Sequence, residues 1–222
     1  MTIETEKDNL SAEIIEDDDN MLVARSVYLS AGLHIGMKQK VKSMEKYIYK
    51  IRSDKLAVFN IQMVDQQIRD AAKMISRYAP EDILVVSRKT NGHKPVVMFA
   101  KAIGGAKVIY GRFYPGTLTN PAYEKFIEPK LVIVTDSNVD QQVIKESFSS
   151  NIPIIGICDT FNDPKYIDFV ISANNKGRKS LSLIYWLLAR EVLKVKEEIK
   201  GDAEFKYTEE DFVMPVSASN LA

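Results

Sequence analysis

The feature that most constrains the fold is a regular alternation of short, apolar, β-branched runs with amphipathic segments. The runs predict strands at residues 56–60, 83–87, 107–110, 131–135, 152–158 and 169–172. Strands that are apolar throughout are buried on both faces, and alternation with helices makes their sheet parallel. The pattern therefore predicts the α/β class, as a single doubly wound (flavodoxin-like) three-layer domain with a mostly parallel sheet.

Helical periodicity separates several of these strands. One helical face carries apolar residues at the spacing i, i+3, i+4, i+7 and i+10, namely Ile68, Ala71, Ala72, Ile75 and Tyr78. Asp65 is a candidate N-cap for this helix, and Pro80 marks its end. Further helices are expected at residues 96–103, at 138–149 with Asn138 as the cap, and at 178–200 with Gly201 as the stop signal.

Charge is segregated along the chain, although 30 basic and 30 acidic residues balance overall. Residues 1–20 carry a net charge of −7 and residues 201–222 a net charge of −4, so residues 21–200 carry +11. We expect a flexible, disordered acidic arm (1–20), an α/β domain (21–200) and a loose acidic C-terminal tail (201–222). The basic domain indicates either an anionic partner or a lysine-rich, solvated surface.

Several protein classes are excluded or disfavoured by composition. No apolar run approaches the roughly 20 residues of a membrane helix, and the acidic N-terminus lacks the pattern of a signal peptide. Cys158 is the only cysteine, which excludes an internal disulfide and a cysteine-cluster metal site. A cytoplasmic protein without a membrane partner is therefore expected.

An enzymatic function is the alternative. Asp136 and Asp159 each follow a predicted strand, where α/β enzymes place acids, but aspartate in such loops also caps helices and orders turns. The two histidines, His34 and His93, are far apart in sequence, and Cys158 lies within an apolar strand. Neither a Gly-x-Gly-x-x-Gly motif after the first strand nor a phosphate-binding loop is present. We therefore expect no catalysis, cofactor, metal or small-molecule substrate.

Four basic and polar segments suit a nucleic-acid backbone instead. They are residues 32–55, 88–94, 111–121 and 174–180, and the last opens a helix whose free N–H groups favour an anion. Arginine and lysine meet phosphates, whereas asparagine, threonine and serine add hydrogen bonds. The candidate RNA-binding residues are His34, Lys38, Lys40, Lys42, Arg88, Lys89, His93, Lys94, Arg112, Thr117, Thr119, Asn120, Asn174, Asn175, Lys176, Arg178 and Lys179.

Position in the fold strengthens this interpretation. Three of the four segments follow predicted strands, so they are expected to share one edge of the sheet. Each segment alone is compatible with an ordinary polar loop, but together, on a domain of net charge +11, they favour RNA binding over catalysis. Phe113 and Tyr114 are candidates either to stack on a base or to pack under their own loop.

Long motifs in the same order resemble the family of the second protein of the small ribosomal subunit. They lie at residues 30–36, 111–113, 115–121, 126–129, 174–181 and 185–191, and the resemblance spans about residues 24–200. The motifs resemble the archaeal branch, and the lack of room for the helical hairpin insertion of bacterial members supports this resemblance. The acidic arm and the C-terminal tail depart from the pattern, so the laminin-receptor role of longer eukaryotic relatives is not carried over.

This resemblance implies a doubly wound α/β fold and a structural role in assembly of the small subunit. It implies contact with small-subunit ribosomal RNA between the head and the body, neighbouring ribosomal proteins as partners, and no catalysis. It does not supply the residues that contact RNA. The candidates above therefore rest on loop position and chemistry alone.

Overall fold

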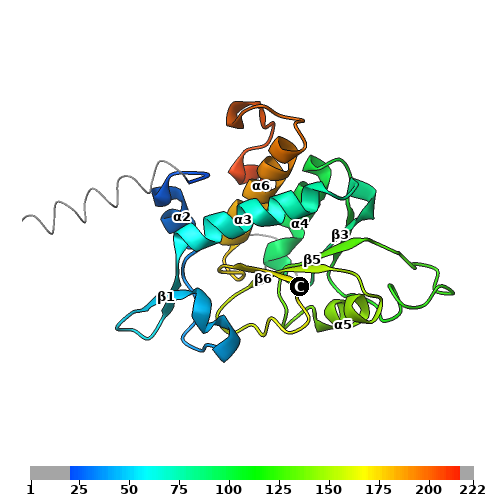
Figure 1. The fold of residues 1–222 in the computed structure, drawn as a ribbon, viewed down its shortest axis with the longest axis horizontal. Coiled ribbons are helices and arrows are strands. Elements are labelled where there is room, and N and C mark those ends of the chain that lie inside the picture. Colours follow the sequence, from blue (N-terminus) through cyan, green and yellow to red (C-terminus); the bar gives the residue numbers. More distant parts are fainter. Residues whose placement is uncertain (1–20, 216–222) are drawn as a thin grey trace, which may run out of the picture.

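Five short apolar strands form a parallel sheet in the order β4-β3-β5-β6-β7 (Figure 1). The computed structural model describes residues 21–215. The strands are β3 (Ile83–Ser87), β4 (Lys107–Tyr110), β5 (Leu131–Val134), β6 (Ile154–Cys158) and β7 (Phe169–Ser172). Every residue of β3, β5 and β6 is buried, as expected for strands that are covered on both faces. The predicted doubly wound fold is confirmed.

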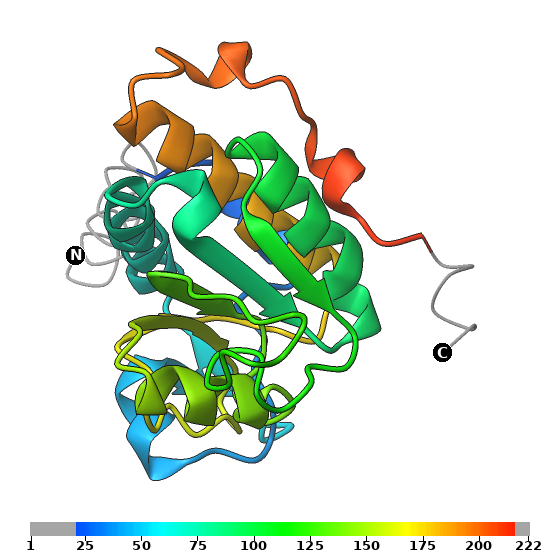
Figure 2. The ribbon, with the colours of Figure 1, turned by 90° about the vertical axis from the view of Figure 1, so that its right-hand side faces the viewer.

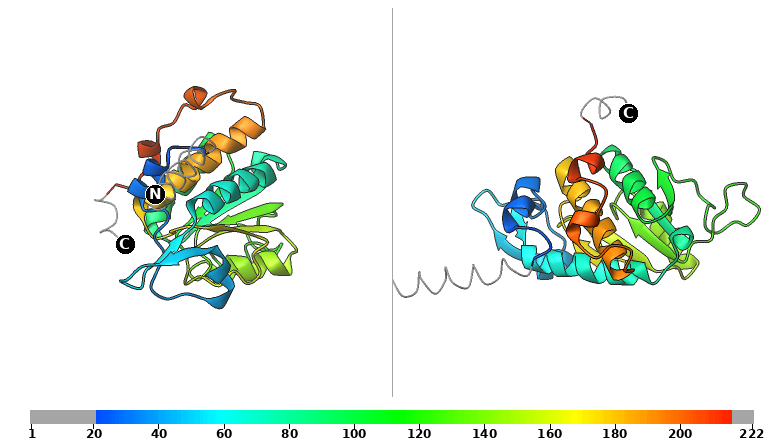
Figure 3. Two further views of the ribbon diagram at one scale, coloured as in Figure 1. Left: turned by 60° about the vertical axis from the view of Figure 1, so that its left-hand side comes forward. Right: turned by 90° about the horizontal axis from the view of Figure 1, so that it is seen from above.

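The two faces of the sheet are covered unequally. Helices α3 (Ile61–Ser76), α4 (Thr90–Ala102) and α6 (Arg178–Val195) lie side by side on one face, with α6 packed against both others (Figure 3). The other face carries α5 (Gln141–Ser149) and two irregular crossovers, residues 111–130 and 159–168 (Figure 2). Helices α3, α4 and α6 pack on the larger of the two hydrophobic clusters. Within residues 21–215, none of the helices has the length and hydropathy needed to cross a membrane.

The strand predicted at residues 56–60 does not belong to the main sheet. β2 (Ala57–Phe59) pairs antiparallel with β1 (Ile48–Ile51), and the pair forms a separate two-stranded sheet. The backbone reverses between them at Lys55, which has a positive φ of 67°, and Arg52 N donates to Leu56 O at 2.9 Å. Pairing with a neighbour in sequence was missed because β1 has only four mostly exposed residues, and Lys50 interrupts its apolar side chains.

Helix boundaries also differ from the sequence predictions. Asn60, not Asp65, caps α3, because its side chain accepts a hydrogen bond from Gln62 N at 3.1 Å. Helix α4 begins six residues earlier than expected, at Thr90, and Asp140 rather than Asn138 precedes α5. Helix α6 ends at Val195 instead of residue 200. The shorter elements are α2 (Arg25–Ala31), η1 (Lys42–Tyr47), η2 (Pro80–Asp82), η3 (Asp202–Glu204) and α7 (Glu209–Phe212).

Asp65 has a different role, which is to fix the segment before the sheet. Its buried carboxylate accepts hydrogen bonds from Leu22 N at 2.8 Å and from the Tyr28 hydroxyl at 2.6 Å. Arg69 Nε lies 2.8 Å from the same carboxylate, so the buried charge is paired. Residues 21–31 are thereby attached to α3.

The prediction of a loose tail from residue 201 is wrong for residues 201–215. Trp186 Nε1 on α6 donates to Tyr207 O at 2.9 Å, and the Phe205 ring packs edge-on against the Trp186 ring. Phe212, in α7, is fully buried. Phe205, Tyr207 and Phe212 lie at irregular spacing among polar and charged residues, so no helical or strand period revealed them. Residues 1–20 and 216–222, including the predicted disordered arm, lie outside the described residues.

Phe212→Ala should lower the free energy of unfolding by about 3 kcal/mol, because a fully buried phenylalanine leaves a cavity. Phe161→Ala is the matched control, since the same substitution at a side chain that is 44% exposed should cost about 0.5 kcal/mol or less. Urea denaturation of both variants measures the difference. Equal, small effects would show that residues 201–215 are not held by Phe212.

Candidate nucleic-acid interface

The loops at the carboxyl ends of the parallel strands meet along one edge of the sheet. We call this edge the rim and define it as residues 33–42, 88–94, 135–140, 159–163 and 173–179. The first of these stretches precedes the sheet but joins the rim through Thr160. Met37 N donates to Thr160 Oγ1 at 2.9 Å, and Val41 N donates to Thr160 O at 2.8 Å. Asn174 N also donates to Leu33 O at 3.0 Å, so the first and fourth basic segments are adjacent.

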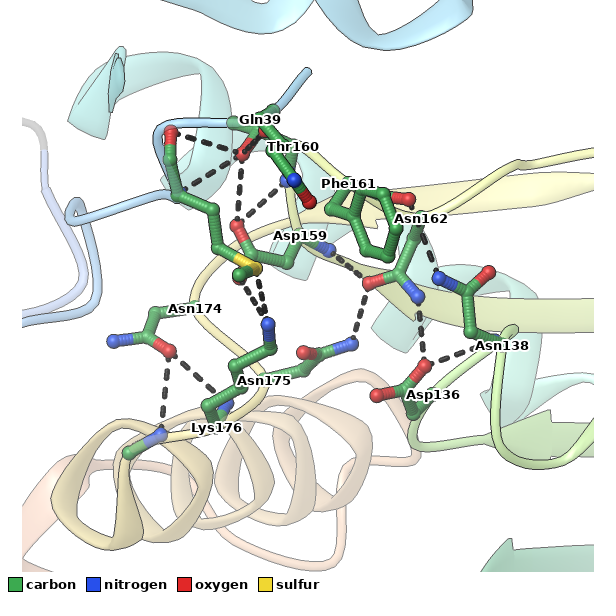
Figure 4. A network of polar contacts seen from close by, with 12 residues as sticks. Gln39, Asp136, Asn138, Asp159, Thr160, Phe161, Asn162, Asn174, Asn175 and Lys176 are labelled. Atoms are coloured by element: carbon green, nitrogen blue, oxygen red, sulfur yellow. Dashed lines mark hydrogen bonds and ion pairs between the residues drawn. The ribbon is translucent and has the colours of Figure 1, made fainter. Parts of the chain in front are cut away.

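Asn175 links three of the rim loops from the inside. Its side-chain Nδ2 donates to Asn162 Oδ1 at 2.9 Å (Figure 4). The same nitrogen donates to Thr135 O at 3.2 Å and to Ile157 O at 3.0 Å. The side chain is fully buried. Asn175 was predicted to contact RNA, but its amide is enclosed and engaged with the protein, so it is a structural residue of the rim.

Asp136 and Asp159 organise the same loops. Asp136 accepts hydrogen bonds from Asn162 Nδ2 at 2.7 Å and Asn138 N at 2.9 Å, and it pairs with Lys89. Asp159 accepts a hydrogen bond from Thr160 N at 2.6 Å. Burial raises the pKa of Asp159, and its carboxylate lies 3.9 Å from Lys176 Nζ.

Both aspartates therefore order turns, as the alternative interpretation of their position proposed. Within residues 21–215, no group of three or more His, Cys, Asp and Glu side chains is placed to hold a metal ion. The enzymatic hypothesis finds no support in this geometry.

The candidate RNA-binding residues differ in accessibility. The exposed ones are Lys38, Lys40, Lys42, Arg88, Arg112, Thr119, Asn120, Lys176 and Lys179. Half-buried side chains are those of His34, Lys89, His93, Lys94, Asn174 and Arg178, and buried ones are those of Thr117 and Asn175. Lys89 is half-buried because its ammonium pairs with Asp136 and lies 3.5 Å from Asn175 O. The accessible positive charge thus comes mainly from residues 38–42, 88, 112, 176 and 179.

The second basic segment is largely helical, contrary to the prediction of a loop. Because α4 begins at Thr90, His93 and Lys94 lie in its first turns, and His93 packs on the Tyr110 ring at 5.5 Å. Asn91 Nδ2 donates to Lys176 O at 2.9 Å, which joins the starts of α4 and α6. Neither helix has a side-chain cap, so both present free N–H groups at the rim, a suitable environment for phosphate.

The third basic segment leaves the rim and folds onto the α5 face. Gly116 N and Leu118 N donate to the Glu146 carboxylate at 2.9 and 3.1 Å. The Thr117 hydroxyl donates to Tyr114 O at 2.7 Å, and the Thr119 hydroxyl lies 3.5 Å from Glu146. Both threonine hydroxyls are thus used within the protein, whereas Arg112, at the start of the segment, is exposed.

The two aromatic residues of this segment have separate roles. Phe113 packs under its own loop and is 8% exposed, whereas Tyr114 is 52% exposed with the Arg112 guanidinium over its ring. Only Tyr114 is available to a partner.

The C-terminal segment contributes acidic residues beside the rim. Arg178 Nη1 donates to Met214 O at 3.4 Å, and helix α7 packs against α4 and α6. Burial raises the pKa of Glu209, and the nearby Lys179 opposes this shift. The sequence suggested no such contact, because residues 201–215 lack periodicity.

Asp140 should make stability depend on pH. Burial raises its pKa to about 7, and the neighbouring Asp136 adds to this effect. The folded protein therefore binds a proton more tightly than the unfolded chain, so stability falls as pH rises from about 4 to 7, with a slope up to about 1.4 kcal/mol per unit.

Asp140→Asn removes this titration. As pH rises from about 4 to 7, the free energy of unfolding of Asp140→Asn should increase relative to that of wild type. Denaturant melts of both proteins at several pH values measure this difference. Asp163→Asn, in an exposed turn, is the control for general charge effects. A pH-independent difference for Asp140→Asn would contradict the assignment.

Comparisons with known proteins place this architecture in one family. The family model described as ribosomal protein S2 matches residues 28–128 and 122–194. Small ribosomal subunit protein uS2 of Ignicoccus hospitalis is 47% identical over 94% of this chain and 96% of its own length. The uS2 proteins of two Methanococcus maripaludis strains are 45% and 44% identical, each over 86% of both chains. All three relatives are archaeal proteins, and the chain belongs to the ribosomal protein S2 family.

Proposed function

We propose that this protein is a structural constituent of the small ribosomal subunit and binds ribosomal RNA along the rim. The observation that carries the proposal is the meeting of three basic segments, distant in sequence, at the carboxyl edge of the sheet. Hydrogen bonds between Asn174 and Leu33 and between Asn91 and Lys176 hold these segments together. Membership of the ribosomal protein S2 family, and the names of its relatives, support the same role.

The chemistry of the rim suits a folded RNA backbone. Exposed lysines such as Lys38, Lys176 and Lys179 can neutralise phosphates and release bound counterions. The N-termini of α4 and α6 add oriented N–H groups beside these charges. Contacts of this kind fix the position and orientation of the protein but carry no sequence code. We therefore infer recognition of RNA shape rather than of a base sequence.

The proposal extends to protein partners and location. The acidic residues Glu209, Glu210 and Asp211, and the acidic stretch at residues 1–20, would meet basic neighbouring ribosomal proteins or basic residues of this chain. The protein would act in the cytoplasm, within assembled small subunits, and without catalysis. Asp136 and Asp159 are buried and accept hydrogen bonds from the backbone of the rim loops, which is consistent with a structural role.

Removing three rim charges should weaken RNA binding selectively. In Lys38→Ala/Lys176→Ala/Lys179→Ala, loss of up to three phosphate contacts should reduce the slope of log affinity against log salt by about one unit per contact. Binding to small-subunit ribosomal RNA, titrated at several salt concentrations, measures the slope. Co-sedimentation of the tagged variant with small subunits, which should decrease, measures incorporation.

The matched control is Arg77→Ala/Lys101→Ala/Lys107→Ala. It removes the same net charge from exposed residues at the opposite edge, where α3 and α4 end and β4 begins. Its salt slope and incorporation should stay close to wild type. Equal losses in both triple variants would show that the positive charge acts without a defined binding edge.

A further inference from the structure

Two aromatic side chains pack against each other at a tilt on the surface, away from the rim. The rings of Phe148, near the end of α5, and Tyr166, in the crossover 159–168, have centroids 4.3 Å apart at 40°. Phe148 is 56% exposed and Tyr166 is 43% exposed, so the pair covers little of the core. The two residues are 18 positions apart in sequence, and no local motif predicted their meeting.

Tyr166 forms a wall shared by two surface cavities. A cavity of about 310 Å³ lies between α5 and the crossover, and Lys145 and Lys165 line it with Tyr166. A second cavity of about 250 Å³ lies beside Phe148 and Asn151, with Tyr166 again on its border. These volumes are at or just below the lower end of those of small-ligand sites. A flat ring inserted from solvent into either cavity could therefore contact Tyr166.

The surroundings of the pair provide two lysines and amide groups, together with the carboxylate of Asp163 in the first cavity and that of Asp168 in the second. Lys165 Nζ lies 4.9 Å from the centre of the Tyr166 ring, and among the described residues neither Lys145 nor Lys165 forms an ion pair with a carboxylate. Asn138 and Gln141 line the first cavity and offer both hydrogen-bond donors and acceptors. Lysines, amides and exposed aromatic rings together favour a nucleotide over a purely apolar ligand.

The backbone holds Tyr166 in an unusual conformation. Its φ is +67°, which is costly for an aromatic residue and persists only where neighbouring contacts impose it. Ile167 N donates to Pro164 O at 3.1 Å, and the Asp168 carboxylate accepts a hydrogen bond from Ile154 N at 2.8 Å. These bonds hold the backbone on both sides of Tyr166 in this conformation.

We propose that Phe148 and Tyr166 form a second RNA contact, at which an unpaired base stacks on the rings while Lys145 and Lys165 meet the flanking phosphates. The proposal rests on RNA binding as the function of the protein and adds a site on the α5 face, distinct from the rim. Stacking on aromatic rings is the common mode of recognition for unpaired bases. The contact would hold a loop or a strand end of the RNA.

A single-stranded hexaribonucleotide that contains one 2-aminopurine tests this site in the full-length protein. Stacking on Tyr166 should quench the 2-aminopurine fluorescence. Tyr166→Leu, which keeps apolar bulk but removes the ring, should weaken binding roughly tenfold and abolish the quenching. Tyr166→Phe should retain both. Leu29→Ala, a substitution of an exposed apolar residue on α2, is the control for unspecific effects, and thermal melts of each variant check folding.

The outcomes distinguish this site from the rim. If the stacking site is correct, the probe is still quenched when it binds the variant Lys38→Ala/Lys176→Ala/Lys179→Ala. This result is expected whether or not the rim proposal holds. If Tyr166→Leu binds and quenches as wild type does, the stacking site is wrong, whatever the rim variant does. Normal probe binding by Tyr166→Leu with reduced co-sedimentation of this variant would also overturn the proposal and indicate a protein partner at the ring pair.

Discussion

The arrangement of the rim depends on one buried amide. Asn175 follows β7, yet its side chain satisfies backbone carbonyls after β5 and within β6, and the side chain of Asn162 after β6. A buried polar group without a partner costs about 1–3 kcal/mol, so the amide and the loops stabilise one another. The exposed Lys176 follows this amide directly in sequence, and α6 begins two residues later. Rigid placement of the external charges is thus a consequence of an internal network.

The unequal covering of the sheet explains where the accessible surfaces lie. Thirteen of the eighteen residues of α6 are buried, because α6 packs between α3 and α4 as well as on the sheet. The opposite face has a single nine-residue helix, α5, flanked by irregular crossovers. Irregular segments pack less continuously than helices, and shallow cavities remain beside α5. The rim and the α5 face are therefore free for partners, whereas the three-helix face mainly stabilises the fold.

The architecture was predictable because apolar runs and helical periods are local signals. All five strands of the main sheet were located, and the motifs at residues 111–121 and 174–181 led to the correct family. Helix boundaries were harder to predict from the sequence. Gly92 and Pro95 lie within α4, and because both residue types normally disfavour a helix, its first turns were predicted as a loop. Packing in the folded protein determines where α4 begins, and this packing cannot be read from a local sequence pattern.

The candidate site was predictable only as a set of segments. Basic loops that follow parallel strands were expected to meet at one edge, and residues 88–94 and 174–180 do so. Residues 111–121 also follow a strand but fold onto the α5 face, whereas residues 33–42 reach the edge although they precede the sheet. Which side chains point outward depends on contacts between loops that are distant in sequence, such as those that bury Asn175 and engage Lys89. The same reason hid the pair formed by Phe148 and Tyr166.

Charge segregation in the sequence takes a specific spatial form. Residues 201–215 do not trail away from the basic body but return to it, and α7 packs against α4 and α6 next to Arg178. Cations at the rim repel one another, and nearby carboxylates such as Glu209 offset part of that repulsion when RNA is absent. RNA would have to replace these internal partners, so its net gain at Lys179 is smaller than at Lys38, which lies in a different loop. If the rim binds RNA as proposed, its affinity would be a difference between external and internal anions, and the buried Phe212 would contribute by holding α7 and Glu209 near Lys179.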